Sequence, residues 1–300
     1  MGIFGKKKKE DENLPTNIFM NPKIKVLEGF ARDGEIPEPI IRMTKHMREK
    51  YGVNVGEYVT LKKDGILVKA RVDVSSKKDG EAEVCRLNKA ARTALMAKIG
   101  DEIEIIPPES IVLLIDTSGS MGDFVSGIVK IDAAKDALRE FIRSKFLMAQ
   151  GDRIGIVTFG EFATVVEGLS TNYEHLENRS QTLVPNGATA MYEGMKLSID
   201  MLSGLSGVKR IVMLSDGVPT TTGRMAVIQA AKDAASKNVV IDTVGVGSPF
   251  DLMGYDEWLL KRIAEITGGT FRRVIELKEL AGSFVEIAQK KNFTYLLPEK

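Results

Sequence analysis

From Ser110 onward the chain alternates short apolar runs with longer amphipathic segments, and this alternation constrains the fold more than any other feature. Runs such as IVLLID and RIVMLSDG are typical of buried strands, while DAAKDALREFIRSKF places its apolar residues at helical spacing. Strands that alternate with helices form a mostly parallel sheet with helices on both faces. We therefore predict a doubly wound α/β domain over residues 110–290.

The preceding segment, residues 22–106, has a different pattern, with short strands broken by turns. The block VNVGEYVTL, residues 53–61, is similar to AKIGDEIEI, residues 97–105, and a basic segment with helical character precedes each block. Two similar units in so short a segment predict a small, pseudo-symmetric β-barrel. Two consecutive prolines, Pro107 and Pro108, mark the boundary between the two domains, because proline cannot continue a strand ladder.

The ends of the chain and its overall composition limit the classes of function. Residues 1–21 include the charge run GKKKKEDENLP and are expected to be a flexible tail, and residues 291–300 a C-terminal tail. The formal net charge is +1, so we expect no nucleic-acid partner. The one cysteine, Cys85, is expected to be buried and fits a reducing, cytoplasmic location. No apolar run approaches the roughly 18 residues of a membrane span, so no membrane partner is expected.

Hydroxyl and carboxylate side chains follow two strands of the predicted sheet. Asp116 ends the first strand, and Ser118 and Ser120 follow it at alternate positions. Asp216 ends a later strand at the same relative place, and Thr189 lies between the two strands, just before a predicted helix. In an open parallel sheet, ligands bind outside the carboxyl ends of the strands, where the strand order reverses. We therefore predict that these five side chains converge.

All five side chains offer oxygen atoms, which are the ligands of hard divalent cations such as Mg²⁺, Mn²⁺ or Ca²⁺. The two carboxylates neutralise such an ion, so it can still accept another anionic oxygen. Zn²⁺ normally binds His or Cys, and both histidines, His46 and His175, lie elsewhere in the sequence. Two other interpretations stay open: ordinary Asp/Ser/Gly turn chemistry, or a phosphate-binding turn that lacks a Walker lysine.

The site motifs resemble those of von Willebrand factor A (vWA) domains. DTSGSM, GATAMYEGM and LSDGVPTT are similar to the loops of the metal-ion-dependent adhesion site (MIDAS) of that family, and IDTVGVGS and LKRIAEITGGTFRRV to later family blocks. The resemblance implies a Rossmann-like sheet. It also implies that Ser118, Ser120 and, depending on state, Thr189 bind the metal directly, whereas Asp116 and Asp216 act largely through water. In this family a partner's Glu or Asp commonly fills the open metal position.

The first segment resembles a second family. GEYVTL and RTALMAKIGDEIEII are similar to blocks in the N-terminal double-psi β-barrel of AAA+ ATPases of the valosin-containing-protein type. The resemblance implies a double-psi barrel over residues 22–106. It also implies that the barrel provides a second docking surface.

Together these features predict a cytoplasmic, metal-dependent protein-interaction module rather than an enzyme. It would be an adaptor or assembly factor that binds an acidic residue of a partner, linked to an AAA+ ATPase. The alternative is a Mg²⁺-dependent phosphohydrolase, in which the metal polarises a phosphate and Arg224 is the nearest candidate to contact it. No general base accompanies the ligands in the sequence. Trp258, the only tryptophan, is expected to pack in the core or a groove rather than to contact a partner.

Overall fold

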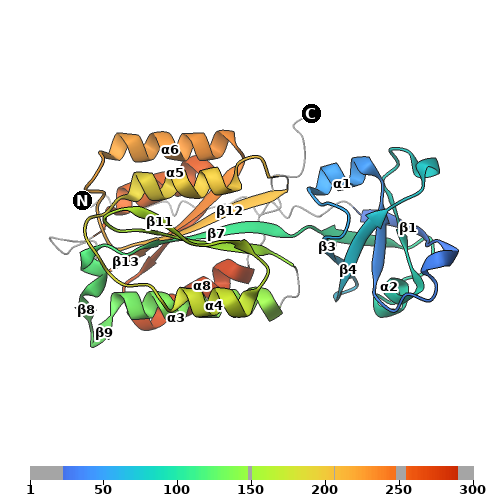
Figure 1. Ribbon diagram of the computed structural model, residues 1–300, viewed down its shortest axis with the longest axis horizontal. Helices are drawn as coiled ribbons and strands as arrows, with labels where there is room; N and C mark the ends of the chain where they lie inside the picture. Colours follow the sequence, from blue (N-terminus) through green and yellow to red (C-terminus); the bar gives the residue numbers. More distant parts are fainter. Residues whose placement is uncertain (1–22, 148–150, 206, 248–254, 290–300) are drawn as a thin grey trace, which may run out of the picture.

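The computed structural model describes residues 23–147, 151–205, 207–247 and 255–289. It has two parts that follow one another along the long axis of the molecule, a β-barrel and an α/β unit (Figure 1). The predicted tails, residues 1–21 and 291–300, lie outside the described residues.

The first part is a closed barrel of six strands in the order β1-β5-β2-β4-β3-β6. Each half of it has the same order of elements: a strand, a 3-10 helix, a second strand, a short α-helix and a third strand. The elements are β1 (Lys23–Glu28), η1 (Ala31–Asp33), β2 (Ile40–Met43), α1 (Lys45–Tyr51), β3 (Tyr58–Lys63), β4 (Ile66–Val74), η2 (Lys77–Asp79), β5 (Val84–Leu87), α2 (Lys89–Ala94) and β6 (Glu102–Ile106).

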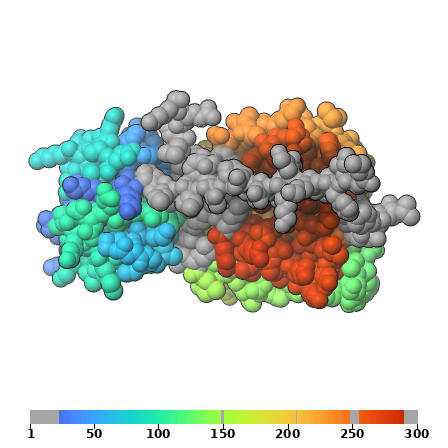
Figure 2. All heavy atoms as spheres, turned by 180° about the vertical axis from the view of Figure 1, so that it is seen from behind, coloured from blue at the N-terminus to red at the C-terminus, as the bar shows by residue number. Residues whose placement is uncertain are grey.

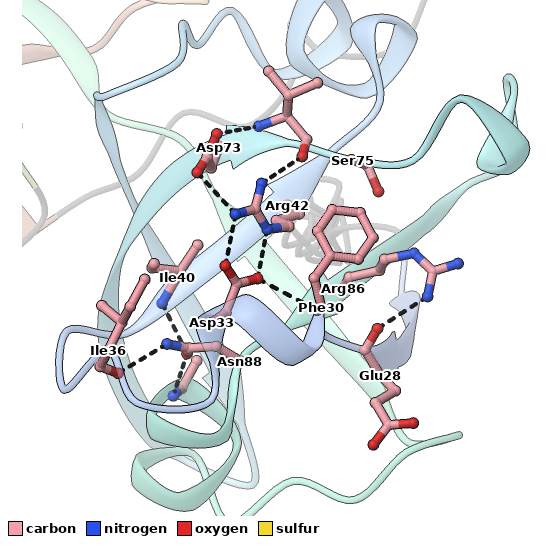
Figure 3. Close-up of polar contacts among 12 residues, drawn as sticks. Glu28, Phe30, Asp33, Ile36, Ile40, Arg42, Asp73, Ser75, Arg86 and Asn88 are labelled. Atoms are coloured by element: carbon pink, nitrogen blue, oxygen red, sulfur yellow. Dashed lines mark hydrogen bonds and ion pairs between the residues drawn. The ribbon is translucent and has the colours of Figure 1, made fainter.

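The internal repeat of the barrel extends to individual side chains. Arg42 on β2 donates hydrogen bonds of 2.6 and 2.7 Å to Asp33, and Arg86 on β5 donates bonds of 2.8 and 2.6 Å to Asp79. Each guanidinium also donates to the carbonyl oxygen of the last residue in its parallel neighbour, β4 or β1. The ring of Phe30 lies against both arginines (Figure 3). The predicted duplication is confirmed, and Cys85 is fully buried in the barrel core.

The second part contains a six-stranded sheet in the order β11-β10-β7-β12-β13-β14. All neighbouring strands in it are parallel except β10 and β11, which form a hairpin. The elements are β7 (Glu109–Asp116), η3 (Gly119–Gly122), β8 (Phe124–Val125), β9 (Ile128–Val129), α3 (Lys130–Leu147), β10 (Arg153–Phe159), β11 (Ala163–Ser170), α4 (Tyr173–Ser180), α5 (Met191–Leu202), β12 (Val208–Ser215), α6 (Arg224–Ser236), β13 (Val239–Val246), α7 (Glu257–Thr267), β14 (Phe271–Val274), η4 (Leu277–Glu279) and α8 (Leu280–Gln289).

Helices cover both faces of this sheet, as the strand–helix alternation predicts. Alternate residues of β7 face opposite layers: Ile111 and Leu113 pack with α3, α4 and α8, whereas Val112 and Leu114 pack with α5, α6 and α7. Figure 1 shows the two helical layers above and below the sheet, and Figure 2 shows α3 and α8 side by side from behind. The doubly wound, mostly parallel fold is confirmed.

The strand order of the sheet places β7 and β12, which carry the predicted site residues, beside each other. β7 pairs with β10 on one side and with β12 on the other, so the strand order reverses between β7 and β12. Their carboxyl ends lie at the end of the sheet opposite the barrel (Figure 1). The edge of the sheet where ligands bind in such folds is therefore far from the barrel.

Two details differ from the sequence-based expectations. Helix α4 and the β8–β9 hairpin were not predicted, because α4 has only two buried residues and each hairpin strand only two residues. The prediction for Trp258 is wrong: its side chain is 60% exposed. The buried stripe of α7 begins one residue later, at Leu259, and leaves the indole outside. Among the described residues, no helix is long and apolar enough to cross a membrane.

Candidate metal centre

The structure brings the predicted site residues to the carboxyl edge of the sheet. Asp116 is the last residue of β7, and Asp216 directly follows β12. Ser118 and Ser120 belong to the tight turn that leaves β7, where Ser118 precedes the 3-10 helix η3. Thr189 lies two residues before α5. Four of the five thus lie at or just after the ends of β7 and β12, and Thr189 comes from the loop between α4 and α5.

Hydrogen bonds join four of the five residues in series. The amide of Ser118 donates to Asp116 Oδ1 at 2.8 Å, and the hydroxyls of Ser118 and Ser120 lie 3.1 Å apart. The Ser120 hydroxyl donates to Asp216 Oδ1 at 2.8 Å. Asp116, Ser118 and Asp216 are each at most 2% exposed, so the polar groups face a nearly dry pocket.

Thr189 reaches the same pocket from its own loop. Its backbone amide donates a hydrogen bond of 2.8 Å to the Thr220 hydroxyl, and this contact fixes the loop to the segment after Asp216. A Cβ atom on Gly217 would lie 3.5 Å from Thr189 Oγ1 and 3.8 Å from Asp116 Oδ2. Those two oxygens therefore flank the same small space, and Thr189 is 5% exposed.

Glycine is required in the loop that carries Thr189. Gly187 has φ +61°, and its carbonyl accepts a hydrogen bond from the Gly119 amide at 3.0 Å. A Cβ atom there would lie 2.4 Å from a side-chain atom of Glu161. The left-handed backbone and the close approach both exclude a larger residue, so Gly187 sets the distance between this loop and the serine turn.

A lysine that the sequence reasoning missed also contacts the site. Lys130, the first residue of α3, places Nζ 2.6 Å from Asp216 Oδ2. Its side chain is 13% exposed, and that of Asp216 is fully buried. Asp123 lies 4.0 Å from the same ammonium group but is 69% exposed and therefore screened by water. No motif in the sequence singles out Lys130, because the β8–β9 hairpin that returns the chain to the site was not predicted.

The electrostatic balance of the pocket favours a bound cation. Burial, and next the charge of Asp216, raise the pKa of Asp116 to about 7. This happens although Ser118 and Ser215 both donate hydrogen bonds to the Asp116 carboxylate, the latter at 2.6 Å. The negative charges of the buried Asp116 and Asp216 therefore exceed the nearby positive charge, because the single ammonium group of Lys130 balances only one of them.

The donor set fits a hard divalent cation. Within the ranges that the structure describes, no group of three or more His, Cys, Asp or Glu side chains could hold a metal ion. A metal at this edge thus depends on the hydroxyl oxygens of Ser118, Ser120 and Thr189 beside the two carboxylates. Alcohol and carboxylate oxygens suit Mg²⁺, Mn²⁺ and Ca²⁺ rather than a tetrahedral zinc site.

Arg224, the candidate for contacting a phosphate, begins α6 and forms an ion pair with Asp256. Its side chain is 58% exposed, whereas Asp256 is nearly buried. Asp256 also caps α7 by accepting the amide of Leu259 at 3.1 Å. The arginine is thus tied to the start of α7.

Large apolar side chains are exposed on the loops and helix ends that follow the sheet's carboxyl edge. They belong to the β8–β9 hairpin, the β10–β11 turn, the loop before Thr189, the loop after Asp216 and the first turns of α6 and α7. Their exposed fractions run from 41% to 75%: Phe124, Phe162, Val184, Val218, Met225 and Trp258. We call these six residues the apolar rim. Such clustering around a polar pocket is typical of an interaction surface.

The α/β unit has the fold of von Willebrand factor A domains. The family model of the von Willebrand factor type A domain matches residues 111–218, which contain all five site residues. A vWA protein from Catenulispora acidiphila has the same fold, with a TM-score of 0.52 and 23% identity over 62% of this chain and 43% of that one.

Two further proteins are similar to this chain. A UPF0353 protein of Mycolicibacterium paratuberculosis is 25% identical over 221 residues, 66% of this chain, and the chain spans only 65% of that relative's length. A structure of proximal thread matrix protein 1 from the mussel byssus, described with a zinc-occupied MIDAS motif, has a TM-score of 0.50 and 19% identity. The match covers 60% of this chain and 46% of the mussel chain.

Proposed function

We propose that this chain is a metal-dependent protein-interaction module whose metal centre consists of Asp116, Ser118, Ser120, Thr189 and Asp216. The observation that carries the proposal is the series of contacts from Asp116 through the two serines to Asp216 at the switch point of a vWA sheet. When bound, the divalent ion supplies an open coordination position for an anionic oxygen. The zinc reported for the mussel protein supports a divalent cation in this fold, and the ligand chemistry here favours Mg²⁺ or Mn²⁺, with Ca²⁺ as a further candidate.

The five side chains have two different roles at the metal centre. The hydroxyls of Ser118, Ser120 and Thr189 bind it, while Asp116 orients the serine turn through the Ser118 amide and Asp216 orients the Ser120 hydroxyl. The buried charges of Asp116, Asp216 and Lys130 sum to −1, so a divalent ion makes the centre +1. A cationic, partly desolvated centre binds a carboxylate from a partner's Glu or Asp.

The apolar rim supports a protein rather than a small anion as the ligand. A free phosphate or carboxylate would leave these six side chains in water, whereas a protein segment that presents an acidic residue can cover them. Interfaces commonly combine a few polar anchors with aromatic and methionine contacts of this kind.

The arrangement of the two parts supports an adaptor or assembly factor. The metal centre lies at the end of the sheet away from the barrel (Figure 1), so both surfaces are free to bind at once. The barrel would be the second docking surface, and an AAA+ ATPase is the partner that its resemblance implies, by fold-level analogy. A cytoplasmic location is proposed on the single, buried cysteine.

Capture of partners from a lysate of the native organism, with Mg²⁺ or with chelator, tests the proposal. For a protein captured only with Mg²⁺, affinity should fall at least about tenfold with chelator and in Ser118→Ala, a loss of about 1.4 kcal/mol. Ser236→Ala, which removes an exposed hydroxyl on α6, is the matched control. If chelator, Ser118→Ala and amide replacement of the partner's acidic residues all leave affinity unchanged, the centre does not bind the partner.

A further inference from the structure

We propose that Lys130 is a built-in cation of the metal centre, which weakens the binding of the metal and strengthens the binding of an anion to the loaded centre. The inference rests on the proposed metal centre, but not on the identity of any partner. It concerns a residue outside the five proposed ligands, on a helix that those ligands do not share.

The ammonium group of Lys130 contacts a carboxylate oxygen of Asp216, next to the place where the ion would bind. Its Nζ lies 2.6 Å from Asp216 Oδ2, and the Ser120 hydroxyl occupies Oδ1 at 2.8 Å. Both oxygens of Asp216 thus have a hydrogen-bond donor. A divalent ion must therefore share Asp216 with an ammonium group of like charge, and this repulsion reduces its affinity.

The burial of the contact makes the charge effective. The Lys130 side chain is 13% exposed and Asp216 is fully buried, so water screens the interaction poorly. The backbone of Lys130 is also held in place, because the residue begins α3 and its amide donates to the Asp123 carbonyl at 3.1 Å. The positive charge therefore lies in direct, largely dehydrated contact with Asp216.

The same charge has the opposite effect on an incoming anion. Without Lys130, two carboxylates and a divalent ion sum to zero, whereas with Lys130 the buried groups sum to +1. A carboxylate that approaches the loaded centre gains from this extra positive charge. One residue thus lowers affinity for the cation and raises affinity for the anion, two effects that a purely structural lysine would not combine.

Lys130→Met tests the inference in the full chain, with Mn²⁺ and acetate as probes. Mn²⁺ affinity is followed by electron paramagnetic resonance, and acetate binding by the loss of water-proton relaxation as acetate displaces water from bound Mn²⁺. We expect Lys130→Met to bind Mn²⁺ about tenfold more tightly and acetate severalfold more weakly than the wild type. Lys130→Gln should change the Mn²⁺ and acetate affinities in the same directions, so a folding defect in one variant would not decide the test.

Two charge controls accompany these variants. Lys130→Arg keeps the charge and should resemble the wild type, and Lys135→Met removes a cation that pairs with Asp132 on the outer face of the same helix. If folded Lys130→Met and Lys130→Gln bind Mn²⁺ equally or more weakly, or acetate equally well, the inference is wrong. If the wild type binds no Mn²⁺, the proposed metal centre itself is wrong.

Discussion

Asp116 is the residue on which the electrostatics of the centre depend most. It is fully buried, and burial together with the charge of Asp216 raises its pKa to about 7. The ionised form of Asp116 is therefore disfavoured in the folded chain unless a cation binds beside it. The amide of Ser118 and the hydroxyl of Ser215 nevertheless donate hydrogen bonds to its two oxygens.

Metal should therefore stabilise the wild type but not Asp116→Asn. An ion that binds only the folded state at 100 times its Kd adds about 2.7 kcal/mol, and Tm rises by about 2–4 °C per kcal/mol for a domain of this size. Thermal melts with Mg²⁺ or Mn²⁺ and with chelator measure the shift, with Asp132→Asn, an exposed helix residue, as control. An equal shift in Asp116→Asn would place the stabilising ion elsewhere.

Asp79 makes the stability of the barrel depend on pH in the acidic range. Hydrogen bonds from Arg86 lower the pKa of Asp79 to about 2, although burial opposes them. A carboxyl group whose pKa is lower in the folded state contributes stability above its unfolded pKa, near 4, and loses it as the pH falls toward 2.

Asp79→Asn should consequently lose stability at neutral pH and show a flatter decline between about pH 4 and pH 2 than the wild type. Thermal melts across this range give the comparison, and Asp64→Asn in the exposed β3–β4 turn serves as control. Parallel curves for the wild type and Asp79→Asn would show that the Arg86 contact does not carry this acid sensitivity.

At the scale of elements, α3 connects the two edges of the sheet. Its first residue, Lys130, contacts the metal centre, and Lys145 near its other end is fully buried against Glu109 and Asp152 at 2.7 and 2.9 Å. Burial alone would lower the pKa of Lys145, but the two carboxylates raise it above its ordinary value. The ion pairs of Lys145 hold α3 to the start of β7.

Lys145→Met should destabilise the chain by about 3–5 kcal/mol, because it removes the cation that both buried carboxylates contact, and Arg210 remains only 3.9 Å from one of them, Glu109. Lys135→Met breaks a pair on the same helix whose carboxylate, Asp132, is 60% exposed, and should cost less than about 1 kcal/mol. Urea unfolding measures both. Similar losses in the two variants would mean that the buried pair contributes no more than a surface pair.

The elements that the sequence predicts well are those with strong periodicity. The strands and long helices after Ser110 follow from their apolar spacing. Four of the five candidate ligands follow from strand ends in a parallel sheet, and Thr189 from its place just before a predicted helix. The contact of Lys130 with the metal centre and the ion pairs of Lys145 cannot be predicted from the sequence pattern. Their partners are distant in the chain, as Glu109 and Lys145 are 36 positions apart, and only the folded packing brings them together.

At the scale of the whole molecule, the two parts have separate hydrophobic cores within the described residues. The barrel core and the two layers of the vWA sheet form distinct clusters of buried residues. One ion pair between the parts joins Arg153 to Glu57 at 3.4 Å, and both side chains are partly exposed. Exposed pairs of this kind contribute little to stability.

A fragment that starts at Pro107 and runs to residue 300 should therefore fold without the barrel. It keeps Glu109, which the Lys145 ion pair needs, and all residues of the metal centre. We expect cooperative melting and Mn²⁺ affinity within about threefold of the full chain, a difference below 1 kcal/mol. An unfolded fragment from a chain that is folded as a whole would contradict the two-domain prediction.

The location of bound Mn²⁺ tests the central claim most directly. Anomalous diffraction from crystals grown with Mn²⁺ should show one strong peak in contact with the hydroxyls of Ser118 and Ser120, next to Asp216. Crystals of Ser118→Ala grown in the same way should lack it. A peak that persists in Ser118→Ala, or a wild-type peak only at some other part of the molecule, would contradict the claim that these residues form the metal centre.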